Sequence, residues 1–222
     1  MSGQGPVRDR HAAGIGLIET MRWEPAQGFV RLARHLARLA GSAAALGIPH
    51  DPSQIAQALD KAAGGGTPMR VRLELRHDGK VEATASAFVP TPPDALWKLH
   101  IASASLDAED PLLRHKTTRR EAYDAARAEF SREDVDEVLL LNQRGEVCEG
   151  TITSVFACLG DGVLVTPPLS CGLLAGVLRT EMLAGGDAVE RVLLPADLAR
   201  ARAIHVGNSL RGLIRCRLDR TG

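Results

Sequence analysis

Alternating and helical patterns of apolar residues define the first elements of the chain. Apolar and polar residues alternate weakly over residues 16–23 (GLIETMRW), which predicts a strand that ends at the turn Glu24-Pro25. Leucine and alanine recur at spacings of three and four in residues 29–47, and this pattern is typical of an amphipathic helix. We expect that helix to end at Gly47.

A second helix and a hairpin follow. Asp51 can cap a helix that runs to about Ala63, where the glycines of residues 64–66 end it. Residues 69–88 alternate between apolar and polar on both sides of Asp78-Gly79. A glycine turn between two alternating runs predicts a β-hairpin.

A proline-rich segment at residues 90–93 is the best candidate for a domain boundary, because consecutive prolines cannot donate hydrogen bonds to a sheet. Strands and helices mix beyond it. We expect strands at 99–104 and 137–142, further strands around 147–159 and 163–165, a final strand pair around 204–218, and helices at 121–130, 176–184 and 196–202.

The pattern therefore predicts an α/β (α+β) chain with two lobes. Residues 14–92 form the small N-terminal α/β lobe of this prediction, and residues 93–222 form the C-terminal lobe. Residues 1–13 mix glycine, proline and charge without periodicity, so we expect a disordered N-terminus or a remnant of the expressed chain.

Composition limits the kinds of partner and of site that we expect. The 27 basic and 27 acidic side chains cancel, which argues against nucleic acid and membrane surfaces as partners and favours a small-molecule substrate. No apolar run approaches a membrane span and no leader pattern precedes the chain, so we expect a cytoplasmic protein. The four cysteines lack CxxC spacing and neighbouring histidines. We therefore expect buried, reduced thiols and no metal site.

Lys116 is the first candidate for chemistry. It lies in residues 112–123 (LLRHKTTRREAY), among Arg114, His115, Arg119 and Arg120. Nearby cations lower the pKa of an amine and make it a nucleophile for a Schiff base. The alternative from the residues alone is a solvated basic face before a helix.

Three further segments carry polar groups in suggestive places. Glu149 follows a turn, and Gly176 begins a predicted helix whose first amides could bind a phosphate. Residues 207–209 (GNS) form a small polar turn between apolar stretches. Each is equally compatible with a purely structural role.

Taken together, these segments resemble the class IV aminotransferase family, the fold-type IV pyridoxal-phosphate enzymes, and are most similar to its aminodeoxychorismate lyase branch. The resemblance covers about residues 14–218. It rests on seven motifs in the family's order: LIETMRW, RLARHLARL, RHKTTRREAYD, EVLLLNQRGEVCEGTITSVF, LVTPP, GLLAGVLR and VGNSLRG. It implies a two-lobed fold, with a small N-terminal lobe and a larger, β-barrel-like C-terminal lobe with helices.

The resemblance implies that pyridoxal 5'-phosphate is the cofactor and assigns roles to matched positions. Lys116 matches the catalytic lysine that forms the Schiff base and moves the proton. Glu149 matches the acid that faces the pyridine nitrogen and strengthens the ring as an electron sink. Arg38 matches the arginine that binds the phosphate, whose geometry suits a guanidinium fork. These roles place the site in a cleft between the lobes.

The remaining matched positions belong to the phosphate side. Val177 and Leu178 match residues that give backbone amides to the phosphate, and Asn208 and Ser209 match the turn that lines the phosphate and substrate. Ser154 departs from the pattern, because the family usually has asparagine there. The usual opening strand with an Asn-Gly turn is also missing.

Three functions are compatible with these residues. The lyase branch implies elimination of pyruvate from 4-amino-4-deoxychorismate to give 4-aminobenzoate, a step of folate biosynthesis. The alternatives are a class IV aminotransferase acting on branched-chain or D-amino acids and a cofactor-binding homologue without turnover. Tyr123 and Arg211 are further candidates for the pocket, or surface residues of helices. The resemblance also implies a homodimer.

Overall fold

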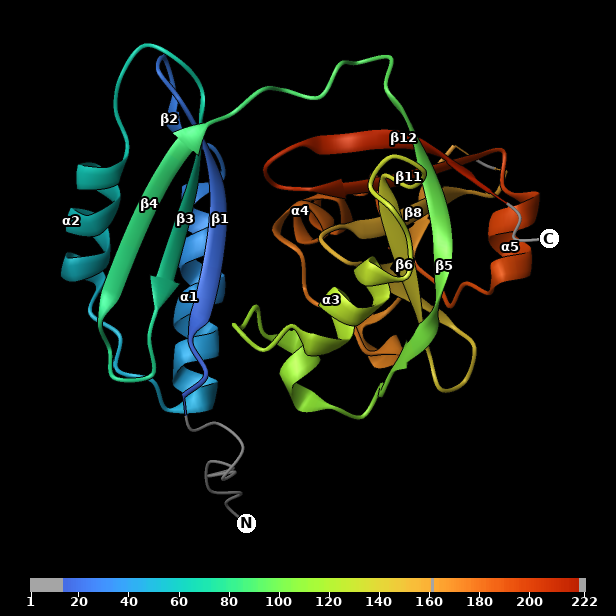
Figure 1. Ribbon diagram of the computed structural model, residues 1–222, viewed down its shortest axis with the longest axis horizontal. Helices are drawn as coiled ribbons and strands as arrows, with labels where there is room; N and C mark the ends of the chain where they lie inside the picture. The colour runs from blue at the N-terminus through green and yellow to red at the C-terminus, as the bar shows by residue number, and fades with distance from the viewer. Residues whose placement is uncertain (1–13, 161, 220–222) are drawn as a thin grey trace. The chain divides into compact units, whose positions relative to one another are not determined.

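The computed structural model describes residues 14–160 and 162–219, and their contacts divide the chain into two units (Figure 1). The first unit consists of residues 14–89 together with residues 115–119. The second consists of residues 90–114 and the described chain from residue 120 onward. The predictions for residues 1–13 lie outside the described residues.

The first unit is a four-stranded antiparallel sheet with the order β2-β1-β3-β4 and two helices. Its elements are β1 (Leu17–Glu24), β2 (Gly28–Phe29), α1 (Leu32–Leu46), α2 (Pro52–Ala62), β3 (Met69–Leu75) and β4 (Val81–Ala87). Both helix ends that the sequence predicts are present: Gly47 ends α1 in the left-handed conformation, and the Asp51 side chain accepts a hydrogen bond from Ser53 N at 2.8 Å.

The core of the first unit lies between one face of the sheet and the helices. It combines alternate residues of β1 and β3 with one side of α1 and of α2. Its buried members are Leu17, Met21, Leu39, Ala43, Ile55, Leu59, Val71, Leu73 and Leu75. The period of two in the strands and of 3.6 in the helices produces this core directly.

The second unit is built on an eight-stranded mixed sheet with the order β10-β9-β8-β11-β12-β5-β6-β7. Its strands are β5 (Leu96–Leu106), β6 (Glu137–Asn142), β7 (Val147–Gly150), β8 (Ser154–Cys158), β9 (Leu164–Thr166), β10 (Ala188–Glu190), β11 (Ala203–Asn208) and β12 (Gly212–Leu218). Its helices are η2 (Pro111–Arg114), α3 (Glu121–Ala128), η3 (Leu169–Cys171), α4 (Val177–Gly185) and α5 (Pro195–Arg200).

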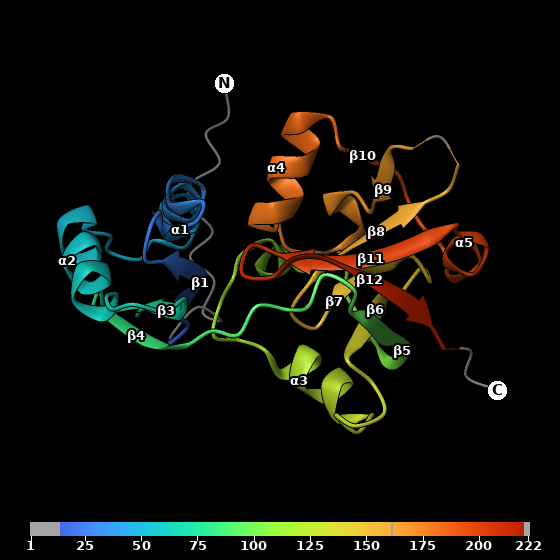
Figure 2. The same cartoon turned by 90° about the horizontal axis from the view of Figure 1, so that it is seen from above.

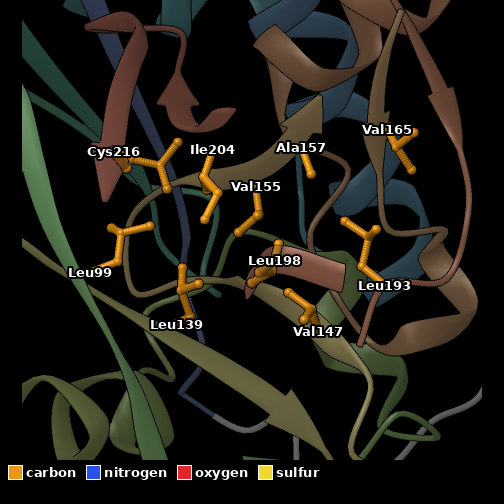
Figure 3. Packing of buried hydrophobic residues seen from close by; sticks show 11 residues of the cluster. Leu99, Leu139, Val147, Val155, Ala157, Val165, Leu193, Leu198, Ile204 and Cys216 are labelled. Atoms are coloured by element: carbon orange, nitrogen blue, oxygen red, sulfur yellow. The ribbon is translucent and has the colours of Figure 1, made fainter. Parts of the chain in front are cut away.

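Helices α3 and α4 lie on opposite sides of this curled sheet (Figure 2). Ala126 of α3 packs in a cluster with Val138 and Leu140 of β6, whereas Leu178 of α4 packs on Phe156 of β8. A third cluster lies between the sheet and α5. It combines Leu139, Val155 and Ile204 of the sheet with Leu198 of α5 (Figure 3). The predicted mixed α+β fold with helices around a curled sheet is confirmed.

Some elements differ from the prediction. β5 begins three residues before the predicted strand at 99–104, because Leu96 pairs with Arg215 of β12. The strands predicted around 147–159 are present as β7 and β8, and the loop 151–153 separates them. The short strands β2 and β10 carry no pattern long enough to predict. None of the helices in residues 14–160 and 162–219 has the length and apolar character needed to cross a bilayer.

Candidate functional site

Lys116 is held along the first strand of the chain. Its carbonyl oxygen accepts a hydrogen bond from Ile18 N at 2.8 Å, and Thr118 N donates to Gly16 O at 2.9 Å. Leu17 and Thr117 form an antiparallel bridge between these two bonds. The backbone of Lys116 is therefore fixed beside β1.

Lys116 belongs by its contacts to a different unit from the one that its position in the sequence suggests. In sequence order Lys116 lies beyond the proline segment, but residues 115–119 belong to the first unit by their contacts. The reason is the strand-like pairing with β1, which a helical or loop pattern in the sequence does not reveal. His115 adds a second contact, because its Nδ1 lies 2.9 Å from Ser42 Oγ of α1.

Arg38 lies on α1 one turn before Ser42, on the same side of the helix. Its guanidinium binds Glu19 of β1 at two points: Nε donates to Oε1 at 2.9 Å and Nη2 to Oε2 at 2.7 Å. His35 Nδ1 lies 2.6 Å from the same Oε2. The first unit thus brings Arg38 and the Lys116 segment to neighbouring parts of α1 and β1.

Glu19 is only 1% exposed. Burial alone raises the pKa of its carboxyl, but the hydrogen bond with His35 and the positive charge of Arg38 more than offset burial and lower the pKa. A carboxylate therefore faces the guanidinium of Arg38 inside the unit.

Glu149 is fixed in the second unit. It lies on β7, is 5% exposed, and its Oε1 accepts hydrogen bonds from Tyr123 Oη at 2.7 Å and from Leu174 N at 3.1 Å. Burial raises the pKa of Tyr123, and the Glu149 charge raises it further, so the phenol stays a donor. Tyr123, a candidate from the sequence, is thereby placed beside Glu149.

The loop that follows Glu149 is organised by the buried carboxylate of Glu137. Its Oε1 accepts hydrogen bonds from Thr151 N at 3.1 Å and Thr151 Oγ1 at 2.6 Å, and its Oε2 accepts from Thr153 Oγ1 at 2.8 Å. Gly150 is needed here, because a Cβ on it would lie 2.4 Å from Thr153 Oγ1. The EGT motif therefore turns tightly around Glu137.

Helix α4 begins without a side-chain cap. Gly176 is its N-cap residue and makes no side-chain capping bond, so the first amides of α4 present the positive end of the helix dipole. Val177 and Leu178 are 4% and 5% exposed. A helix start of this kind is suited to a phosphate.

The turn at residues 207–209 approaches the same end of α4. A Cβ on Gly207 would lie 2.7 Å from Gly212 O and 2.9 Å from Leu178 Cδ2, so this close approach to the backbone and to α4 requires glycine. The Asn208 side chain shapes the turn: Oδ1 accepts from Arg211 N at 2.9 Å, and Nδ2 donates to Ile152 O at 3.1 Å. Ser209, at 6% exposed, follows it.

Ser154 lies directly against the start of α4, since a Cβ on Gly176 would be 2.7 Å from its Oγ. Arg211, the other sequence candidate, places its guanidinium over the ring of Trp97, 5.9 Å from the centroid. Its contact is thus with the sheet at β5.

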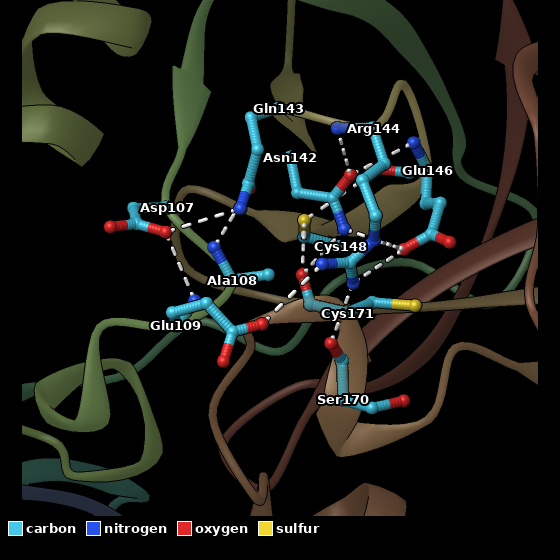
Figure 4. A network of polar contacts seen from close by, with 10 residues as sticks. All are labelled: Asp107, Ala108, Glu109, Asn142, Gln143, Arg144, Glu146, Cys148, Ser170 and Cys171. Carbon is cyan, nitrogen blue, oxygen red and sulfur yellow. Dashed lines mark hydrogen bonds and ion pairs between the residues drawn. The ribbon is translucent and has the colours of Figure 1, made fainter.

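A network of polar contacts around Arg144 supports the loop that leads to Leu174 (Figure 4). Arg144 Nη2 donates to Ser170 O at 2.8 Å and pairs with Glu146 at 2.8 Å. The Asn142 side chain donates to Cys171 O at 3.0 Å. These bonds tie the β6–β7 turn to residues 170–171, three residues before the amide that binds Glu149.

The donor set in the second unit fits pyridoxal phosphate. A fixed carboxylate suits the pyridine nitrogen, and an uncapped helix start beside a Gly-Asn-Ser turn suits the phosphate. Leu174 connects these two parts, because its amide binds Glu149 three residues before α4 begins. Among residues 14–160 and 162–219, no group of three or more His, Cys, Asp or Glu side chains is placed to hold a metal ion.

Three residues of this arrangement were missed in the sequence: Glu19, His35 and Glu137. A signal for Glu19 was present, because it occupies a position between Leu17 and Met21 that the alternation assigns to the core. An acid at such a position needs a buried partner. Which residue is that partner cannot be read from the strand pattern.

Comparison with known proteins gives one consistent family. The family model described as "Amino-transferase class IV" matches residues 16–218. A protein of Schizosaccharomyces pombe named "Putative aminodeoxychorismate lyase" is 32% identical over 189 residues, which cover 81% of this chain and 80% of that protein.

Two solved structures are similar throughout. A "putative amino-acid aminotransferase" from Mesorhizobium loti is 53% identical, with a TM-score of 0.91, over 92% of this chain and 100% of that one. The 4-amino-4-deoxychorismate lyase from Pseudomonas aeruginosa is 28% identical, with a TM-score of 0.75, over 98% of this chain and 88% of that one.

Proposed function

The chain belongs to the amino-transferase class IV family of pyridoxal-phosphate-dependent enzymes, and on that premise we propose that it is an aminodeoxychorismate lyase. It would eliminate pyruvate from 4-amino-4-deoxychorismate and release 4-aminobenzoate. We propose Lys116 as the catalytic lysine that binds the cofactor covalently, with Glu149 at the pyridine nitrogen. Arg38, Val177, Leu178, Asn208 and Ser209 would bind the phosphate side.

The observation that carries the proposal is the fixed carboxylate of Glu149. The bound cofactor supplies an electron sink that stabilises negative charge on the substrate carbon bearing the amine. A negative carboxylate beside the pyridine nitrogen favours its protonated form, and the Tyr123 and Leu174 donors hold that carboxylate in one orientation.

Lys116 moves the proton in this proposal. With its amine free, Lys116 would take the proton from the amine-bearing ring carbon of the substrate. The electron pair of that C–H bond enters the ring, and the bond from the ring to the enolpyruvyl oxygen breaks. The enolpyruvyl group would leave with the electron pair of that bond as enolpyruvate, which becomes pyruvate by taking up a proton on its methylene carbon, while the ring becomes aromatic.

An amino-acid aminotransferase is the second candidate, and the 53% identical structure from Mesorhizobium loti favours it. Lys116 would remove the same type of proton and deliver it to a different carbon, and the amino group would pass to a keto acid. The lyase proposal is supported by the Schizosaccharomyces pombe relative and by the Pseudomonas aeruginosa structure.

Product analysis separates the two reactions. We expect the purified protein, supplied with pyridoxal phosphate and 4-amino-4-deoxychorismate, to release 4-aminobenzoate and pyruvate in equal amounts. Lys116→Ala should abolish this release, whereas the matched variant Lys61→Ala, at an exposed position of α2, should retain it. Amino-acid-dependent formation of a new amino acid from 2-oxoglutarate, with no 4-aminobenzoate, would refute the lyase and support the aminotransferase.

A further inference from the structure

Glu19 is an acid at a core position of the first unit. Its neighbours on the same face of β1 are Leu17 and Met21, which are 1% and 0% exposed. The side chain of Glu19 is 2% exposed and points at α1, where it contacts His35 and Arg38. The strand therefore places a carboxylate where its pattern calls for an apolar side chain.

Stability alone gives no reason for this acid. Buried ion pairs often contribute no more than a well-packed apolar replacement, because both charges lose their water. What such a pair does provide is a fixed geometry for the groups that it joins. The partner whose geometry matters in this unit is Arg38, whose side chain is 13% exposed and reaches the surface.

The contact is of the kind that fixes orientation. Glu19 binds both Nε and Nη2 of Arg38, which sets the plane of the guanidinium as well as its position. His35 lies one turn before Arg38 on α1 and holds the carboxylate from a second direction, through the 2.6 Å contact with Oε2. Neither rotation of the carboxylate nor rotation of the guanidinium is compatible with all three contacts.

We propose that Glu19, supported by His35, is a positioning residue that presents Arg38 to the phosphate of the cofactor; this inference rests on the role proposed above for Arg38. The preformed fork lowers the conformational entropy that phosphate binding would otherwise cost. Glu19 thus contributes to the affinity for the phosphate group and not to the affinity for the pyridine ring.

A comparison of pyridoxal phosphate with pyridoxal, which lacks the phosphate, tests this directly. The measured quantity is the dissociation constant of pyridoxal divided by that of pyridoxal phosphate, each obtained by titrating the compound into the apoprotein. We expect Arg38→Ala to reduce the ratio about 10- to 100-fold, as expected for hydrogen bonds to a charged group. We expect Glu19→Gln to reduce it about tenfold, the order typical of partners that orient a ligating group.

The double variant and a matched control make the test specific. If Glu19 acts through Arg38, adding Glu19→Gln to Arg38→Ala changes the ratio no further. Glu24→Gln is the control, because Glu24 lies on the same strand but pairs with Arg22. The substitution removes the same charge without removing a partner of Arg38. His35→Phe keeps the Glu19 carboxylate and the shape of the ring but removes the Nδ1 contact, so it should reduce the ratio in the same direction, even if Glu19→Gln does not fold.

The outcomes distinguish the two proposals. If Glu19 is merely structural, Glu19→Gln lowers the denaturation midpoint and weakens the binding of both compounds alike, so the ratio stays unchanged. That result, with Arg38→Ala still lowering the ratio, would overturn the inference. If Arg38→Ala itself leaves the ratio unchanged, the proposed role of Arg38 fails and the inference falls with it. If the wild-type protein binds neither compound, the proposed function fails first.

Discussion

Replacement of Glu137 by glutamine is the sharpest test of how the second unit builds its site. Five hydrogen bonds end on the two oxygens of this residue, from the amides of residues 138, 151 and 152 and from the hydroxyls of Thr151 and Thr153. Glu137 is 0% exposed. Glutamine keeps the size of the side chain and changes only its charge and one acceptor.

The cost follows from this list of donors. In the less costly orientation the new amide nitrogen takes the place of Oε2, which leaves the amide of Ile152 without its acceptor, while the Thr153 hydroxyl can rotate to accept. The bond of the Ile152 amide is partly buried, so loss of its acceptor costs about 1 kcal/mol, and the remaining bonds lose their charge assistance. We expect the second unit to lose about 2 to 4 kcal/mol of its free energy of unfolding.

The two tryptophans of the chain allow this unit to be observed alone. Trp97 packs against the core of the second unit and Trp23 against that of the first. In a Trp23→Phe background, urea unfolding followed by Trp97 fluorescence reports on the second unit. Hydrogen exchange of the amides of residues 151 and 152 should also accelerate in the Glu137→Gln variant.

Glu133→Gln is the matched control, because Glu133 is exposed and surface changes of this kind stay within about 0.5 kcal/mol. A Glu137→Gln variant whose free energy of unfolding falls by no more than the control's would refute the reasoning. Unchanged exchange of the loop amides would do the same, because the loop would then be held by other contacts.

Three further predictions concern other buried groups. Since the pKa of Glu19 is lowered in the folded chain, its contribution to stability is present above its ordinary pKa of 4.5 and is lost as the pH falls through the folded value; below about pH 5 the free energy of unfolding of the first unit, measured with urea, should therefore fall less steeply with pH in Glu19→Gln than in the wild type. Tyr123→Phe removes a 2.7 Å donor from Glu149 and should lower turnover about tenfold, measured as product release, with a loss of about 1 kcal/mol in the free energy of unfolding; full turnover would show that the bond is dispensable. Of the four thiols, the partly exposed Cys158 should react first with a thiol reagent at pH 8. Burial raises the pKa of Cys171 to about 11 and of Cys216 to about 12, and it also raises the pKa of Cys148. Mass spectrometry after brief labelling identifies the site, and early labelling of a buried thiol would contradict the packing.

Local patterns predicted those parts of the fold that short stretches of sequence determine. The Gly47 end of α1, the Asp51 cap and the hairpin at Asp78-Gly79 follow from residues within a few positions of one another. The true start of β5 and the pairing of Lys116 with β1 could not be predicted in this way. Both depend on partners about a hundred residues distant, Arg215 for β5 and Ile18 for Lys116.

In the candidate site, too, single residues could be predicted but the contacts between elements could not. The resemblance supplied Lys116, Arg38 and Glu149 as single residues, and their roles remain predictions. Tyr123 was a candidate for the pocket, but its bond to Glu149 was not predictable, and neither Glu19 nor its bond to Arg38 was predicted, because both contacts run between elements and not along one. A buried acid in a strand is visible in a sequence, but its partner appears only when the strand and helix are packed together.

The visible absorbance of the purified protein supplied with pyridoxal phosphate tests the central claim most directly. If Lys116 binds the cofactor covalently, as proposed, the wild-type protein should become yellow and keep its colour through desalting. Lys116→Ala should lose this band and Lys61→Ala should keep it. A wild-type protein that stays colourless, or a Lys116→Ala variant that keeps the same band, would contradict the assignment of Lys116 and with it the proposed enzyme.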